Sequence, residues 1–255
     1  MRPVLFHIGS FAVYSYGVFL FLAFLAGTFL AGRELKRKGL DGSAIYPVGA
    51  VAAISGVAGA RLFYVLGHWS EFSAHWPSVF DLNMRGLVFY GGLALAVPAC
   101  LLTVRRMGLP AGKVADAVGL VLPLCLAVAR VGCFLNGCCG GEPSGLPWAV
   151  TFPDSYTAVH PTQLYELALD LALFFLLLRL RRRVSGDWDL FLLAVGGYGA
   201  VRFLVEFFRY HPQASARYLF QGVSLTAAAL LLPLAYWRER RAGSEDAKGE
   251  SDRGS

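Results

Sequence analysis

Four polar side chains recur at helical spacing within one apolar stretch near the end of the chain. The stretch 194–212, AVGGYGAVRFLVEFFRYHP, is apolar enough to lie in a bilayer, yet it contains Tyr198, Arg202, Glu206 and Arg209. Steps of four, four and three residues place these side chains on one face of an α-helix. Because an isolated charge in lipid costs several kcal/mol or more, we predict that this face turns toward the interior of the helix bundle.

Two further arginines, Arg61 and Arg130, interrupt other apolar stretches, and few acidic residues accompany them. The pair Arg202–Glu206 alone could be a structural ion pair that only fixes helix packing. Intramembrane arginines with so few acids nearby leave uncompensated positive charge, however, and the planar guanidinium group matches the geometry of phosphate. We therefore predict a basic cavity that opens outward and binds the anionic headgroup of a phospholipid.

The composition is typical of a polytopic membrane protein. Of the 255 residues, 56% are hydrophobic and 16% are charged, whereas soluble domains carry about 25% charged residues. The formal charge of +6 does not indicate nucleic acid, because the Lys and Arg residues form short clusters between apolar runs, as topology determinants do. The sequence contains no GxGxxG or Walker pattern, so we predict no nucleotide cofactor and no nucleic-acid partner.

Seven apolar stretches are long enough to cross the ~30 Å hydrocarbon core as helices, which predicts an all-α fold. Fourteen Lys and Arg residues flank one set of their ends and four flank the other. The positive-inside rule then places the N-terminus outside and the C-terminus in the cytoplasm. The stretches are 11–32, 44–66, 86–104, 114–135, 161–180, 188–208 and 217–237.

The expected layout is one transmembrane helical domain, 1–241, followed by a polar cytoplasmic tail, 242–255, that we predict to be disordered. The segments 67–85 and 138–160 are expected to lie at the outer membrane surface, where aromatic residues concentrate. In this layout the intramembrane arginines all fall in the outer half of the bilayer.

Five cysteines are present, and the odd number together with their placement in apolar runs argues against a disulfide framework. Cys133, Cys138 and Cys139 are close in sequence, but zinc favours a fourth ligand and a C-x-x-C spacing. We therefore predict no metal site and expect these residues to pack a tight turn beside the cavity. A disulfide among them is the alternative.

Several stretches resemble the bacterial prolipoprotein diacylglyceryl transferase family. The resemblance is clearest in ARVGCFLNGCCGG (129–141), HPTQLYE (160–166) and GYGAVRFLVEFFR (197–209), and weaker in YSYGVF, GARLFYVL and VFYGGL. It implies transfer of the diacylglyceryl group of phosphatidylglycerol to the lipobox cysteine in the signal peptide of a prolipoprotein. A thioether would form and glycerol phosphate would leave, without metal or cofactor, in the bacterial plasma (inner) membrane with the active site toward the outer leaflet.

The resemblance also implies residue roles. Arg130 and Arg202 would bind the phosphate and stabilise the leaving group, Glu206 would orient Arg202, and Arg209 would guide the headgroup at the mouth. Further substrate contacts are expected from Tyr16, Arg61, Asn136, Gly137 and Gln163.

This chain departs from the family pattern at positions that bear on catalysis. The family often has His where this chain has Tyr90, Asn at Cys133 and Glu at Cys138. The general base is therefore open between Tyr90, His160, and water or lipid phosphate. Two other functions also stay open: non-catalytic binding or transport of anionic lipid, and a related transferase with a different donor or acceptor.

Overall fold

The computed structural model describes residues 1–9, 11–72, 88–153, 156–184, 186–211, 221–235 and 238. The chain divides into two compact units, and each is described by itself. Unit one consists of Met1–Ala31 and Ala115–Ser255, and unit two of Gly32–Val114. The predicted tail 242–255 and most of the predicted loop 67–85 lie outside the described residues.

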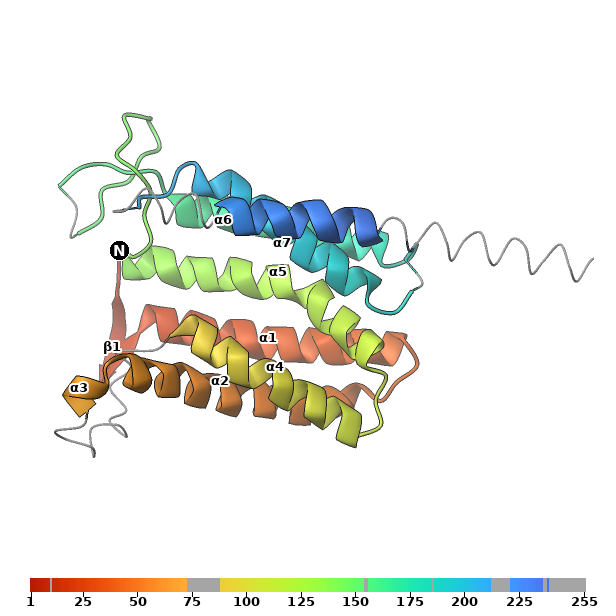
Figure 1. Ribbon diagram of the computed structural model, residues 1–255. Helices are drawn as coiled ribbons and strands as arrows, with labels where there is room; N and C mark the ends of the chain where they lie inside the picture. Colours follow the sequence, from red (N-terminus) through yellow and green to blue (C-terminus); the bar gives the residue numbers. More distant parts are fainter. Residues whose placement is uncertain are drawn as a thin grey trace, which may run out of the picture. The chain divides into compact units, whose positions relative to one another are not determined.

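Each predicted apolar stretch coincides with a helix of the structure (Figure 1). Three helical segments, Ser15–Arg37, Gly42–Gly67 and Ala111–Asn136, are long and apolar enough to cross a membrane. The prediction of a helical membrane protein is therefore confirmed. The helices are α1 (Ser15–Arg37), α2 (Ile45–Gly67), α4 (Phe89–Arg106), α5 (Ala111–Asn136), α6 (Thr162–Leu180), α7 (Asp189–Glu206) and Gln221–Ala235, with the short η1 (Gly42–Ala44) and α3 (Trp69–Phe72).

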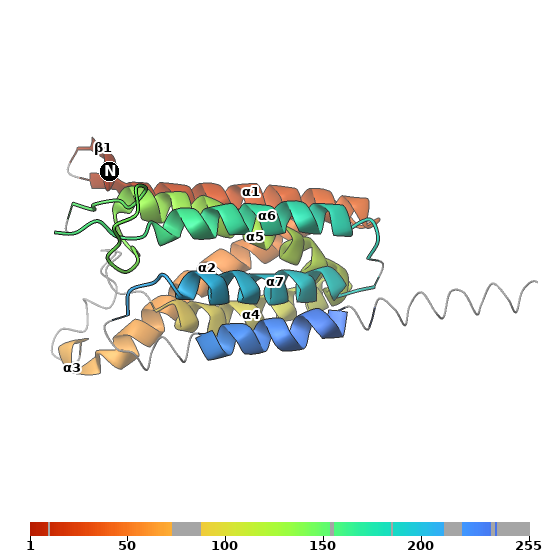
Figure 2. The ribbon, with the colours of Figure 1, turned by 90° about the horizontal axis from the view of Figure 1, so that it is seen from above.

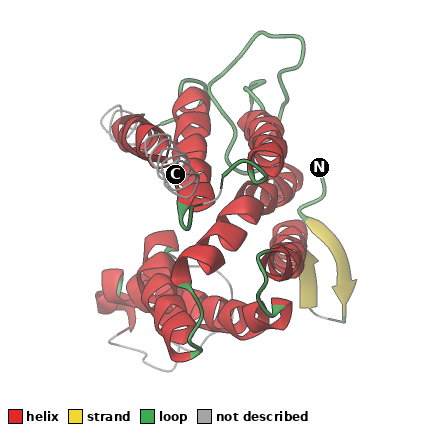
Figure 3. Ribbon diagram, turned by 90° about the vertical axis from the view of Figure 1, so that its right-hand side faces the viewer, coloured by secondary structure: helices red, strands yellow, loops and turns green. Residues whose placement is uncertain are grey.

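The first predicted helix differs from the structure at its start. Strand β1 (Val4–Ile8) pairs antiparallel with β2 (Phe11–Tyr14), so a hairpin precedes α1 and the fold is not purely helical (Figure 3). The sequence of β2 mixes aromatic and β-branched residues, which suit a strand at least as well as a helix. Helix α1 begins only at Ser15, whose backbone N–H donates to the carbonyl of Pro3 at 2.8 Å.

In unit two, α2 and α4 pack against each other through glycines. A Cβ at Gly59 or Gly92 would overlap a backbone oxygen of the facing helix, and one at Gly91 would overlap Phe63. Small residues allow helices in membranes to approach closely, where packing replaces the hydrophobic driving force. The backbone N–H of Val88 also donates to the carbonyl of Ala60 at 3.1 Å, which joins the start of α4 to α2.

In unit one, α5, α6 and α7 enclose an apolar core that includes Leu120, Leu177 and Leu190. The buried carboxylate of Asp116 on α5 accepts a hydrogen bond from the backbone N–H of Phe191 at 3.0 Å. This bond satisfies an otherwise unpaired donor in the first turn of α7. The bond therefore fixes the position of α5 relative to the start of α7, whereas the charged residues lie near the other end of α7.

The helix Gln221–Ala235, blue in Figure 2, packs beside α7. A Cβ at Gly199 would lie 2.8 Å from the carbonyl oxygen of Ser224, and one at Gly196 would lie 3.0 Å from Leu232. These two glycines keep one side of α7 flat for this neighbour, while Val201 and Val205 face the core.

Candidate active site

Helix α6 carries a row of buried polar side chains. Thr162, Gln163, Glu166 and Asp170 are each at most 1% exposed, and their spacing places them on one side of the helix. The large side chains Phe175 and Leu176, by contrast, are more than half exposed. Such an inside-out distribution fits a helix with lipid on one side and a polar interior on the other.

Glu166 is the centre of a charged cluster. Its Oε1 accepts hydrogen bonds from Nη2 of Arg130 on α5 at 2.8 Å and from Nη1 of Arg202 on α7 at 3.1 Å. Its Oε2 lies 3.5 Å from Nη1 of Arg209, just beyond the end of α7. One carboxylate from α6 therefore gathers three guanidinium groups that are far apart in the sequence.

A second carboxylate holds Arg202 from its other side. Oε2 of Glu206, one helical turn later on α7, accepts from Nη2 of Arg202 at 2.7 Å. Oε1 of Glu206 contacts Nε2 of His211. The planar guanidinium group of Arg202 is thus fixed between two carboxylates, a geometry that an ammonium group cannot reproduce.

The carboxylates and the arginines of the cluster differ in exposure. Glu166 and Glu206 are at most 1% exposed, whereas the side chains of Arg130, Arg202 and Arg209 are 17–20% exposed. The negative groups are therefore covered, and the positive groups keep an accessible edge. Because three arginines face two glutamates, positive charge also stays in excess at that edge.

Asp170 is the other acidic residue on the polar side of α6. It is fully buried one turn beyond Glu166, and among the described residues neither of its carboxylate oxygens has a hydrogen-bond partner. Asp170 thus differs from Glu166 in its direct contacts, because the carboxylate of Glu166 meets three arginines.

The segment after α5 is attached to the start of α6 and the end of α7. Oγ1 of Thr162 donates to the carbonyl of Cys139 at 2.8 Å, and Nε2 of Gln163 donates to that of Cys138 at 2.6 Å. The backbone N–H of Glu142 donates to the carbonyl of Phe208 at 2.9 Å. A Cβ at Gly141 would overlap that same carbonyl oxygen, so only glycine allows this approach.

An apolar cavity of about 460 Å³ lies between α6, α7 and the segment 138–160. Aromatic side chains form one wall, where Nε1 of Trp148 donates to Oη of Tyr165 at 2.8 Å. Nδ1 of His160 lies 3.2 Å from the same hydroxyl, and the His160 ring packs on Phe208 at 5.2 Å. Leu169 and Leu204 contribute the apolar surface from the two helices.

The structure brings some of the predicted site residues together and not others. Arg130, Arg202, Glu206 and Arg209 meet in the charged cluster, with Gln163 one turn before Glu166. The other predicted residues of unit one lie around it: Tyr16 packs against Gly132, Asn136 and Gly137 end α5, and His160 lines the aromatic wall.

Two predicted residues belong to unit two. The guanidinium group of Arg61 lies 5.4 Å from the ring of Phe72, and Tyr90 is 65% exposed at the start of α4. Their predicted roles in binding and catalysis stay predictions.

Glu166 is the residue whose importance the sequence did not reveal. It lies at the end of the HPTQLYE stretch, at the same expected depth as the arginines, but no role was predicted for it. The signal that could have identified it is the scarcity of acids available to balance the arginines.

Most of the chain is similar to one protein family. The family profile "Prolipoprotein diacylglyceryl transferase" matches residues 3–237. A protein of Clostridium tetani is 32% identical over 224 residues, which cover 86% of this chain and 90% of the relative. A protein of Methylocella silvestris is 38% identical over 202 residues, 73% of this chain and 74% of the relative.

A further relative, from Bordetella avium, is 39% identical over 157 residues, 60% of each chain. All three relatives carry the name phosphatidylglycerol–prolipoprotein diacylglyceryl transferase. The resemblance seen in the sequence is thereby confirmed. With the match running from residue 3 to residue 237, this chain belongs to the prolipoprotein diacylglyceryl transferase family.

Proposed function

We propose that this chain is a membrane transferase that moves the diacylglyceryl group of phosphatidylglycerol onto the lipobox cysteine of prolipoproteins. The names of its relatives state the donor and the class of acceptor. The observation that carries the proposal is the exposed edge of Arg130, Arg202 and Arg209 above the buried Glu166. This edge has the charge and the geometry to bind a lipid phosphate.

The reaction explains why such an edge is needed. The thiolate sulfur of the acceptor attacks the phosphate-bearing carbon of the diacylated glycerol. A C–S bond forms there, and the bond between that carbon and the phosphate oxygen breaks. Glycerol phosphate leaves with the electron pair, and the thiol proton passes to a base or to solvent. Negative charge grows on the phosphate oxygens as the bond breaks, and guanidinium groups held in place beforehand stabilise it most effectively.

Arg130 and Arg202 are assigned the phosphate because their guanidinium groups converge on one oxygen of Glu166, at 2.8 and 3.1 Å. A phosphate bound across their accessible edges would contact both at once. Glu206 acts as a positioning residue for Arg202. Arg209 lies beyond the end of α7, where it would meet the headgroup first.

The apolar cavity between α6, α7 and the segment 138–160 lies next to the end of α7. Its walls come from these three parts of the chain, and Leu204 on the α7 side is 51% exposed. We assign this cavity to an apolar part of a substrate, either an acyl chain of the lipid or the apolar core of the signal peptide. We also expect Asn136 and Gln163 to hydrogen-bond the glycerol hydroxyl groups of the lipid headgroup.

The proposed arrangement in the membrane has seven spans, with the N-terminus outside and the site toward the outer leaflet. The seven helices and the bias of Lys and Arg toward one set of ends support it. At the start of α7, away from the charged cluster, the carboxylate of Asp189 accepts a hydrogen bond from Nε of Arg238 at 2.8 Å. The predicted location in the bacterial inner membrane follows from the donor lipid and the acceptor.

The test uses the purified protein in nanodiscs with phosphatidylglycerol and a lipobox peptide. The expected products are a peptide heavier by one diacylglyceryl group and an equal amount of glycerol phosphate. A peptide in which serine replaces the lipobox cysteine is the control and should stay unmodified. Binding of lipid without either product would instead support a non-catalytic lipid-binding protein, and transfer only from another phospholipid would show a different donor.

A further inference from the structure

The end of α5 folds back on itself and brings separated cysteines together. Gly137 adopts φ +76°, its N–H donates to the carbonyl of Phe134 at 3.2 Å, and the N–H of Cys138 donates to that of Cys133, also at 3.2 Å. This pair of bonds is a Schellman motif, in which glycine takes the left-handed position that ends a helix. Residues five apart, Cys133 and Cys138, therefore become neighbours although their spacing does not resemble C-x-x-C.

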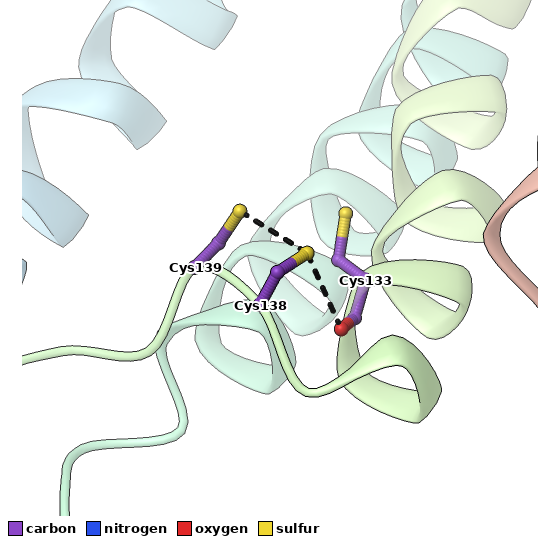
Figure 4. A group of neighbouring side chains, drawn as sticks. All are labelled: Cys133, Cys138 and Cys139. Carbon is purple, nitrogen blue, oxygen red and sulfur yellow. Dashed lines mark hydrogen bonds between the residues drawn. The ribbon is translucent and has the colours of Figure 1, made fainter. Parts of the chain in front are cut away.

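The sulfur atoms of three cysteines gather at this turn. The Sγ atoms of Cys133, Cys138 and Cys139 all lie within 4.8 Å of one another, and those of Cys138 and Cys139 are 3.5 Å apart. Figure 4 shows the three side chains on the same side of the turn. Two thiolates bound tetrahedrally to one zinc ion at 2.3 Å would be about 3.8 Å apart. A small shift of the sulfur atoms would therefore bring them to the separation expected for ligands of one zinc ion.

The backbone that presents these sulfurs is fixed from outside the turn. The carbonyls of Cys138 and Cys139 accept hydrogen bonds from the buried side chains of Gln163 and Thr162. Cys139 has φ +69°, a left-handed conformation that costs a non-glycine residue energy and persists only where surrounding contacts impose it. The sulfur positions are thus set by neighbouring groups in the way that outer partners orient metal ligands.

The charge and exposure of the cluster also suit an ion. Nη1 of Arg130 lies 4.0 Å from Sγ of Cys133, so a positive group offsets part of the charge of three thiolates. Cys133 is buried whereas Cys139 is exposed, so the cluster has a solvent side through which an ion can enter. Thiolate ligands select soft ions such as Cu⁺ and Zn²⁺ over Mg²⁺ or Ca²⁺.

We propose that Cys133, Cys138 and Cys139 together bind one thiophilic metal ion, Zn²⁺ or Cu⁺, through three thiolates. Each thiol releases its proton to solvent as its bond to the ion forms, without any change of oxidation state. Bound there, the ion ties the end of α5 to the following segment, one turn from Arg130. The proposal differs from the sequence expectation of no metal site, and its test does not depend on the transferase activity.

The experiment measures metal affinity directly. The full-length protein in detergent is reduced, freed of reductant, and titrated with Zn²⁺ or Cu⁺ against a chromophoric chelator. One tight equivalent is expected in the wild type and in the control variant Cys100→Ser/Cys125→Ser, whose cysteines lie elsewhere in the described structure. Cys138→Ser and Cys139→Ser should each weaken binding by about 100-fold, and Gln163→Ala by about tenfold.

Spectroscopy adds a readout that does not depend on affinity. Co²⁺ bound to the wild type should show thiolate-to-metal charge-transfer absorption that is absent in the variant Cys133→Ser/Cys138→Ser/Cys139→Ser. Equal metal uptake by this triple variant and the wild type would overturn the proposal. So would the loss of two free thiols to a disulfide, without metal uptake, under the same conditions.

Discussion

Glu166 on α6 accepts a 2.8 Å hydrogen bond from Arg130, which lies 36 residues earlier on α5, and its carboxylate is completely covered. A buried charge in a membrane protein is costly unless an opposite charge meets it. The contact therefore defines which sides of α5 and α6 face the protein interior. It also explains why an apolar chain retains charges at all, because the covered glutamate holds arginines whose other edge is accessible.

Replacing Glu166 by Gln should remove this support. Without the negative charge, the three guanidinium groups repel one another, and the amide offers one acceptor oxygen where the carboxylate offered two. Breaking a buried ion pair of this kind costs about 3–5 kcal/mol. We expect a large fall in the thermal unfolding temperature and in diacylglyceryl transfer, measured in the same detergent preparation.

The matched control for this change is Asp170→Asn on the same helix. Asp170 is equally buried, but its carboxylate has no hydrogen-bond partner among the described residues. This variant should stay close to the wild type in both measurements. If Glu166→Gln and Asp170→Asn behaved alike, the central position of Glu166 would be refuted.

The shape of the guanidinium group at Arg202, and not only its charge, should matter. Its two terminal nitrogens bond to different carboxylates, Glu166 at 3.1 Å and Glu206 at 2.7 Å. Lysine keeps the charge but offers a single nitrogen. We therefore expect Arg202→Lys to lower kcat by about 10²–10³, the loss typical for one stabilising donor.

The comparison for Arg202→Lys is Arg179→Lys, at the other end of α6, where the side chain is exposed. Steady-state kinetics with phosphatidylglycerol should show no change there. Wild-type kcat in Arg202→Lys would mean that the two-sided contact has no catalytic role.

Much of the fold was predictable, because long apolar runs in a chain of this composition have few alternatives to membrane helices. The start of α1 was not, since Phe11–Tyr14 suits a strand as well as a helix. The arginines of the site were predictable from the cost of placing charge among apolar residues.

The partner of those arginines was not predictable. Sequence spacing shows which residues share one helix face, but not which helices are neighbours, so the position of Glu166 between α5 and α7 emerged only from the structure. The sequence did predict that Cys133, Cys138 and Cys139 pack a tight turn. It did not show how closely their sulfur atoms approach, because that depends on the conformation of the turn that ends α5.

The aromatic wall of the cavity should affect substrate binding more than chemistry. Trp148→Ala removes the 2.8 Å hydrogen bond to Tyr165 and a large part of the wall. We expect KM to rise several-fold with kcat nearly constant, because interactions made equally in the bound and transition states change only binding. Tyr156→Ala, a fully exposed position in the same segment, is the control. A fall in kcat without a change in KM would contradict this assignment.

The close approach of Gly141 to Phe208 should not tolerate a methyl group. The added Cβ of Gly141→Ala would overlap the Phe208 carbonyl oxygen and break its hydrogen bond with Glu142. Overpacking of this kind costs about 1–3 kcal/mol, so the unfolding temperature in detergent should fall. Gly145→Ala, with no atom within 4 Å of the new Cβ, should unfold like the wild type. Equal unfolding temperatures for the two variants would show that the segment adjusts freely.

The most direct test of the phosphate-binding edge is the rate at which Arg130→Ala releases glycerol phosphate from phosphatidylglycerol in the presence of a lipobox peptide. ³¹P NMR on protein in nanodiscs follows this release, and circular dichroism verifies that the variant is folded. With the guanidinium group absent, release should slow by about 10²–10³ relative to the wild type. Release at the wild-type rate from a folded Arg130→Ala variant would contradict the account.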